Sequence, residues 1–111
     1  MATLQPAQLL RLYVNEQDKH GHEPLYEALT YAARQAGLSG ATVTKGVLGF
    51  GAQGQMESAK LLTLAENLPL VLDFVDSPAV LTRFLPEVER LFGEAGCGGL
   101  VTLTDVQAAH Y

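Results

Sequence analysis

The chain has 111 residues, of which 48% are hydrophobic and 17% charged, so it is long enough for one ordinary domain with its own core and too short for a multi-domain enzyme. The net charge is −5, and residues 61–111 hold two basic against seven acidic residues, which disfavours nucleic-acid binding. The chain has a single cysteine, Cys97, and its first residues do not resemble a signal peptide, so we expect a cytoplasmic protein. We expect one domain over residues 1–111.

The first half of the chain predicts a strand, a helix and a second strand. Residues 8–15 are rich in strand formers and lead into a polar loop over residues 16–23. Pro24 then suits the first position of a helix whose apolar residues recur at helical spacing until Gly37. Residues 41–50 regain β-branched character and are predicted to form the next strand.

The second half repeats this order after a glycine-rich loop. Residues 68–76 predict a strand that ends at Ser77, a helix cap followed by a proline. The helix is expected over residues 77–94, and Pro86, which lacks an N–H, should kink or divide it. Residues 100–103 predict a last short strand. Two β-α-β units in tandem predict an α+β, ferredoxin-like split βαβ sandwich, a four-stranded antiparallel sheet with two helices on one face.

Strand alternation divides the first and third strands into two faces. One set is wholly apolar and should meet the helices: Leu10, Leu12, Val14, Leu70, Leu72 and Phe74. The other is mixed: Leu9, Arg11, Tyr13, Val71, Asp73 and Val75. Arg11 and Asp73 are expected to be cross-strand neighbours there, as an interface pair or as ordinary solvent-facing charges. Because two helices cover only one face, the mixed face predicts a homo-oligomer.

The densest local signal is the run of four glycines between Gly46 and Gly54. Backbone of this kind can approach a phosphate closely and direct several N–H groups at it. Residues 49–54 also match G-x-G-x-x-G, followed by a candidate helix over 55–66 and by Asp73 and Asp76, which is the pattern of a dinucleotide fingerprint. The chain is too short after Asp76 for a dinucleotide fold, so a phosphate loop or a connection without a ligand are the remaining interpretations.

Other polar groups offer weaker signals. Lys45 and Lys60 flank the first glycine-rich segment and could balance phosphate charge. A second glycine-rich segment, residues 93–99, lacks the Gly-Lys-Ser/Thr ending of a P-loop. Asp18, His20 and His22 are candidate metal ligands in the loop after the first strand, although a surface loop of this composition is more often only polar. No catalytic motif is evident, and the chain is not expected to be an enzyme.

Taken in order, a series of short sequence segments resembles the PII-like family known as domain of unknown function 190. The segments span residues 18–20, 24–28, 36–43, 46, 49–52, 68–69, 75–77 and 99–106, and the resemblance extends from about Leu10 to Tyr111. It implies a ferredoxin-like subunit that forms a homotrimer and binds small effectors, commonly adenine nucleotides, in clefts between subunits. It also implies a long loop over residues 51–60 that reorganises on binding, and a phosphate-holding loop over residues 96–99.

Two departures limit what the resemblance carries over. Met56, Glu57 and Ser58 stand where relatives often have Ile-His-Thr, and the segment 96–99 has fewer lysines than a typical PII phosphate loop. Some relatives are associated with a fluoride-export membrane protein, which makes such a transport protein a candidate partner.

The function predicted from the sequence is a PII-like signalling protein that binds a small anionic effector, an adenine nucleotide for preference, and signals through a flexible loop. The expected ligand-binding residues are Gly49, Phe50, Gly51, Ala52, Lys45, Lys60, Gly96, Gly98 and Gly99. The alternatives are a divalent-metal-binding trimer of the cation-tolerance type, which would use Asp18, His20 and His22, and a small ferredoxin-like hydrolase.

Overall fold

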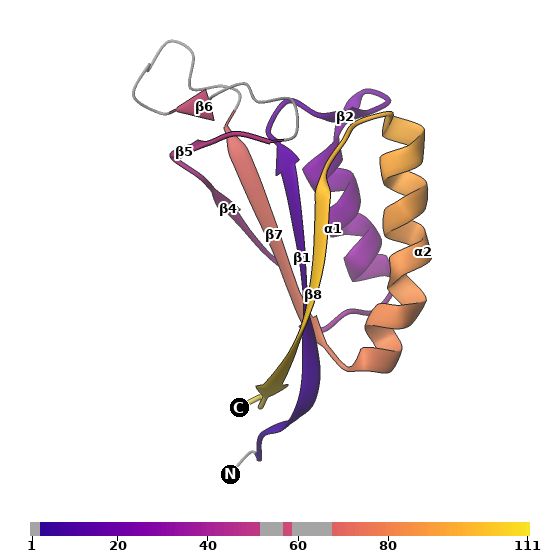
Figure 1. The fold of residues 1–111 in the computed structure, drawn as a ribbon. Coiled ribbons are helices and arrows are strands. Elements are labelled where there is room, and N and C mark those ends of the chain that lie inside the picture. Colours follow the sequence, from indigo (N-terminus) through magenta and orange to yellow (C-terminus); the bar gives the residue numbers. More distant parts are fainter. Residues whose placement is uncertain (1–2, 52–56, 59–67) are drawn as a thin grey trace.

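The computed structural model describes residues 3–51, 57–58 and 68–111. Its centre is a four-stranded sheet of order β4-β7-β1-β8, in which every neighbouring pair is antiparallel. These strands are β1 (Gln5–Asn15), β4 (Thr42–Lys45), β7 (Pro69–Asp76) and β8 (Leu100–Ala108). The helices α1 (Leu25–Gln35) and α2 (Pro78–Ala95) lie together on one face, as Figure 1 shows. The predicted ferredoxin-like α+β sandwich is therefore confirmed.

The core forms where the helices meet the wholly apolar side of the strands. Leu10, Leu12 and Phe74 are completely buried, and the rest of the predicted inward set is at most 5% exposed. From the helices, Leu25 and Leu29 of α1 and Leu81, Phe84, Val88 and Leu91 of α2 complete the same cluster. The rings of Phe74 and Phe84 pack edge to face with centroids 5.7 Å apart, so the middle of the sheet is joined to the middle of α2.

Several predicted boundaries were wrong. β1 begins at Gln5 and β8 continues to Ala108, because the first residues of β1 pair with the last residues of β8 beyond the end of β7. The polar loop over residues 16–23 contains a small hairpin of β2 (Lys19–His20) and β3 (Glu23–Pro24), which turns at Gly21 with a positive φ. Pro24 accordingly ends a strand, and the helix starts one residue later.

The stretch expected as one strand over residues 41–50 is interrupted. β4 stops at Lys45, where the Gly46 N–H donates to the carbonyl of Pro69 at 2.7 Å. β5 (Leu48–Gly49) then leaves the main sheet and pairs with β6 (Glu57–Ser58). The candidate helix over residues 55–66 is contradicted at β6, and its remaining residues lie outside those described.

Proline 86 does not divide the second helix. α2 runs without interruption from Pro78 to Ala95, with Pro86 inside it on the exposed side. The Ser77 hydroxyl accepts the Val80 N–H at 3.3 Å at its start, and Gly96 ends it in the left-handed conformation. The buried apolar side chains of α2 pack against the sheet, and this packing stabilises the helix although Pro86 cannot donate a backbone hydrogen bond.

Candidate anion site at one end of the sheet

Both glycine-rich segments lie at the same end of the sheet, which is the upper end in Figure 1. β1 and β4 end there, and β7 and β8 begin there. The segment 46–51 follows β4, one edge strand, whereas the segment 96–99 precedes β8, the other edge strand. Three strand spacings of about 4.8 Å, roughly 14 Å in all, separate the end of β4 from the start of β8.

Two glycines of the first segment are required by packing. A Cβ atom on Gly46 would lie 2.9 Å from Cγ of Pro69, and one on Gly49 would lie 3.2 Å from the same atom. Both residues therefore let this segment fold closely over the start of β7. The next residues are open: a Cβ on Gly51 would meet nothing within 4 Å, and Phe50 is 70% exposed. Ala52 lies outside the described residues.

The glycines of the second segment also differ in their tasks: some have a structural role, and others have open space beside them. Gly96 has φ +68° and donates its N–H to the carbonyl of Phe92 at 3.0 Å, which ends α2. A Cβ on Gly99 would lie 2.5 Å from Cε1 of Phe92 and 2.9 Å from the carbonyl oxygen of Tyr13, so only glycine fits between α2 and β1. A Cβ on Gly98 would meet nothing within 4 Å. Gly98 and Gly51 thus have space beside them, and so does Gly96, whose positive φ ends α2.

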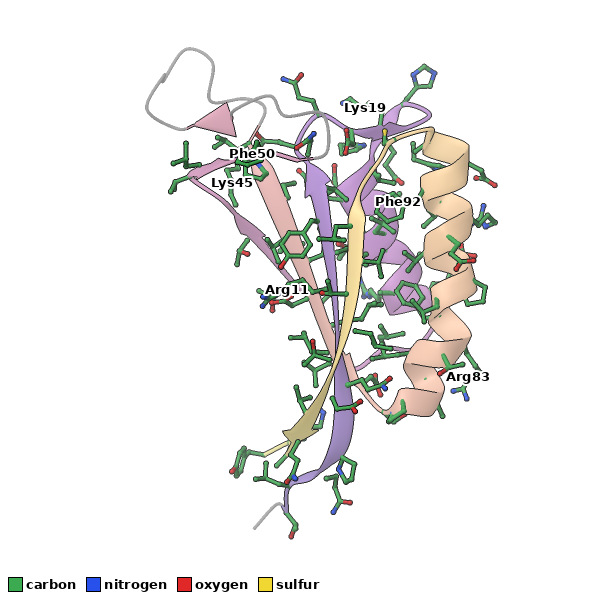
Figure 2. All side chains as sticks on the ribbon, in the orientation of Figure 1. Arg11, Lys19, Lys45, Phe50, Arg83 and Phe92 are labelled. Atoms are coloured by element: carbon green, nitrogen blue, oxygen red, sulfur yellow. The ribbon has the colours of Figure 1, made fainter. Side chains whose placement is uncertain are left out.

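Two lysines among the described residues stand at this end of the sheet. Lys45 and Lys19 lie there, as Figure 2 shows, and Lys60 lies outside the described residues. The Lys45 ammonium contacts Oε2 of Glu16 at 2.5 Å, so its charge is compensated within the chain. Lys19 makes no ion pair with the residues that the structure describes.

Lys19 was not among the predicted site residues. It belongs to β2, and its backbone contacts the thiol of Cys97 in the second glycine-rich segment. Burial, reinforced by the charge of Asp18, raises the pKa of that thiol, which makes Cys97 a poor nucleophile. The sequence shows Lys19 as the one lysine of the polar run 16–23. Its proximity to Cys97 could not be predicted, because the two residues are remote in sequence.

The candidate metal ligands are engaged in separate contacts. The Asp18 carboxylate accepts the Asn15 N–H at 2.9 Å, and the Asp18 carbonyl accepts the Leu25 N–H at 2.8 Å, so Asp18 connects β1 to the start of α1. His20 lies 2.8 Å from Glu94 of α2 through Nε2, whereas His22 is exposed. The hydrogen bonds with His20 and Arg90 lower the pKa of Glu94. Over the described parts of the chain, no three histidine, cysteine or carboxylate side chains gather into a possible metal centre.

The open face of the sheet carries the predicted cross-strand pair. Arg11 and Asp73 stand directly opposite each other in β1 and β7, and the guanidinium donates to both carboxylate oxygens at 2.7 and 2.9 Å. That pairing raises the pKa of Arg11 further above its ordinary value. The side chains of Arg11 and Asp73 are 39% and 29% exposed, and Figure 2 shows Arg11 on the side of the sheet turned away from the helices. The surrounding residues of this open face are apolar side chains and threonines: Leu9, Tyr13, Val71, Val75 and Leu100, with Thr42, Thr44, Thr102 and Thr104.

The dinucleotide-fingerprint interpretation is wrong. Its two candidate acids do not face the glycine-rich segment: Asp73 pairs with Arg11, and Asp76 stands at the opposite end of β7. The sheet is antiparallel, whereas a dinucleotide domain needs parallel strands with helical crossovers.

Comparison with known proteins agrees with the resemblance noted in the sequence. The family model described as Uncharacterized ACR, DUF190, matches residues 7–108. A UPF0166 protein from Aquifex aeolicus is 32% identical over 102 residues, which cover 92% of each chain. A UPF0166 protein from Methanocaldococcus jannaschii is 33% identical over 99 residues, which cover 89% of this chain and 88% of that protein. The chain belongs to the DUF190 family.

Solved structures with a similar backbone are PII-like proteins. CPII from Thiomonas intermedia K12, a nitrogen regulatory PII-like protein bound to ADP, AMP and bicarbonate, superposes with a TM-score of 0.72 at 19% identity, covering 97% of this chain and 92% of CPII. A protein from Thermus thermophilus described as PII-like signaling gives a TM-score of 0.68 at 17% identity, covering 95% and 91% of the two chains. At these identities the likeness establishes a PII-like fold. No helix in the described part of the chain is both long and apolar enough to cross a bilayer.

Proposed function

We propose that this DUF190 protein is a PII-like regulatory protein that binds a small anionic effector, an adenine nucleotide carrying one or two phosphates. The observation that carries the proposal is that two glycine-rich segments lie at the same end of the sheet, with Lys45 and Lys19 beside them. Exposed backbone N–H groups next to glycines suit phosphate oxygens. Lys45 is compensated by Glu16, and Lys19 pairs with no described carboxylate. This small amount of available positive charge suits a short phosphate chain better than a triphosphate.

The binding cleft is proposed to lie between subunits of a homotrimer. Within one chain the two segments leave opposite edge strands of the sheet, so each lies beside an edge that a neighbouring chain can approach. In a ring of subunits, the β8 edge of one chain can approach the β4 edge of the next, which brings Gly98 of one subunit near Gly51 of its neighbour. The open face, with its apolar side chains and threonines, gives such a ring an interior surface to bury.

Signalling is proposed to follow from an ordering of residues 51–60 when the effector binds, as the family resemblance implies. Apart from Gly51 and the strand pairing of β6, these residues lie outside those described. A membrane transport protein, such as a fluoride exporter, is the proposed target on the ground of the resemblance alone. The scheme needs no covalent chemistry.

The direct test is isothermal titration calorimetry with AMP and ADP, supported by thermal shift, because a ligand that prefers the folded state raises its midpoint. Binding at micromolar to sub-millimolar concentrations is expected. Lys19→Gln should weaken it about fivefold through loss of one phosphate contact. Arg83→Gln, on the outer side of α2, removes an equal charge away from the site and should leave affinity unchanged. Absence of binding by any adenine nucleotide at millimolar concentration would contradict the proposal.

The metal-binding alternative is separated by a second measurement. Asp18 and His20 already make contacts that organise the loop after β1, and no observation favours a metal there. Metal analysis of protein purified without a histidine tag should return no stoichiometric divalent ion if the nucleotide proposal holds.

A further inference from the structure

Glu16 occupies an unusual position beside the candidate anion site. It directly follows β1, and its N–H donates to the carbonyl of Leu68 at 2.9 Å, which fixes its backbone at the start of β7. Its side chain is only 21% exposed, and Oε2 contacts the Lys45 ammonium at 2.5 Å. The other carboxylate oxygen, Oε1, is covered and accepts no hydrogen bond from any described residue.

This arrangement leaves a carboxylate that is only partly compensated. A covered oxygen has lost its water, and no donor among the described residues replaces it, so its negative charge acts strongly on its surroundings. Lys45 is the last residue of β4 and immediately precedes Gly46, so the pair stands at the root of the first glycine-rich segment. A phosphate chain that needs Lys45 must compete with Glu16 for it, and any phosphate near this segment meets the repulsion of Glu16 itself.

We propose that Glu16, by holding Lys45, limits how much negative charge an effector can bring to this end of the sheet. The inference rests on the proposed function, because it concerns the selectivity of that same site. A nucleoside monophosphate can bind with the ion pair intact, whereas a triphosphate needs Lys45 and is disfavoured while Glu16 occupies it. Glu16 is therefore a specificity-determining residue that was absent from the predicted site.

The experiment compares AMP and ATP binding by calorimetry, at low ionic strength and without Mg²⁺, so that the phosphate charge is not masked. Glu16→Gln keeps the length and hydrogen-bonding capacity of the side chain and removes its charge. We expect affinity for ATP to rise roughly tenfold and affinity for AMP roughly threefold at most, because the Coulomb interaction scales with ligand charge. Glu16→Ser, which removes the same charge with most of the side chain, should shift the ATP-to-AMP ratio in the same direction.

Two controls separate the effect of the ion pair from that of bulk charge. Asp105→Asn makes the same change of charge near the other end of β8, where the carboxylate accepts a hydrogen bond from Gln8 at 3.1 Å, and should leave the ATP-to-AMP ratio unchanged. In a Lys45→Gln background, Glu16→Gln should lose most of its gain, because the cation that it releases is gone.

The outcomes distinguish failure of the inference from failure of the proposed function. If the wild type binds AMP and Glu16→Gln leaves the ratio unchanged, the inference is overturned and the proposed function stands. The inference is also overturned if Asp105→Asn shifts the ratio equally, or if the gain persists undiminished in the Lys45→Gln background. If neither wild type nor variants bind any nucleotide, the proposed function falls and the inference with it.

Discussion

Asp76 shows how one side chain connects three segments far from the candidate site. Its carboxylate accepts the Ser39 N–H at 2.9 Å and the Ser77 N–H at 2.7 Å, and thereby joins the loop before β4 to the end of β7 and the start of α2. Partial burial would raise the pKa of Asp76, but these hydrogen bonds outweigh it and hold the pKa below its ordinary value of 3.8. Residues 36–43 and 75–77, two of the short sequence segments on which the family resemblance rests, are therefore in contact.

The lowered pKa makes a prediction about stability and pH. Because the folded state favours the ionised form, the contribution of Asp76 is fully present above the unfolded-state pKa and is lost as pH falls through the folded-state value. Asp76→Asn should lower the free energy of unfolding by about 1 kcal/mol at pH 7, and the difference from wild type should shrink toward pH 3. Urea unfolding at fixed protein concentration measures both values; a difference that is independent of pH would contradict the prediction.

Residue spacing predicted where the glycines gather but not which task each performs. Gly49 and Gly99 were predicted to bind ligand, whereas the structure shows that each also permits a close approach, to Pro69 and to Phe92 respectively. Both tasks require the absence of a Cβ, so a glycine pattern cannot separate them. In the same way, Lys45 was predicted as a free cation because its partner Glu16 is remote in sequence and meets it only through the pairing of β4, β7 and β1.

Element-scale predictions were accurate where hydrophobic periodicity was strong. The alternation in β1 and β7 correctly predicted both faces and the Arg11–Asp73 pair. Strand limits failed where polar residues interrupt the pattern: Gln5 of β1, and Asp105 and Gln107 of β8, are strand residues only because the two strands pair with each other. Tertiary pairing overrides local propensity there.

The second helix offers a prediction at the scale of an element. Pro86 cannot donate to the carbonyl one turn earlier, and an internal proline costs about 3 kcal/mol relative to alanine in an unconstrained helix. Since α2 is continuous and Pro86 is exposed, Pro86→Ala should restore the hydrogen bond without disturbing the core and stabilise the protein by about 1–3 kcal/mol. Thermal unfolding measures the gain. A lowered midpoint would indicate instead that the helix geometry imposed by the proline is needed for packing on the sheet.

At the scale of the whole molecule, the order of elements predicted the fold and the uncovered face predicted association. Two helices can cover only one side of a four-stranded sheet, and the other side retains apolar side chains and threonines around one ion pair. Neither the number of subunits nor their arrangement follows from one chain. The trimer therefore stays a prediction, and the proposed cleft between subunits depends on it.

Two valines with the same exposure test that association. Val75 on the open face and Val43 in β4 are each 37% exposed, but Val43 stands opposite the buried Leu72 and so belongs to the helix side of the sheet. Val75→Glu places a charge in the surface that a trimer buries and should convert the assembly, three chains of 11.9 kDa each, toward monomers without unfolding them. Light scattering after size exclusion gives the mass, and circular dichroism checks the fold. Val43→Glu, on the helix side of the sheet, should lower the trimer mass less than Val75→Glu does. If wild type is already a monomer at working concentrations, the cleft between subunits does not exist, and nucleotide binding should also be absent.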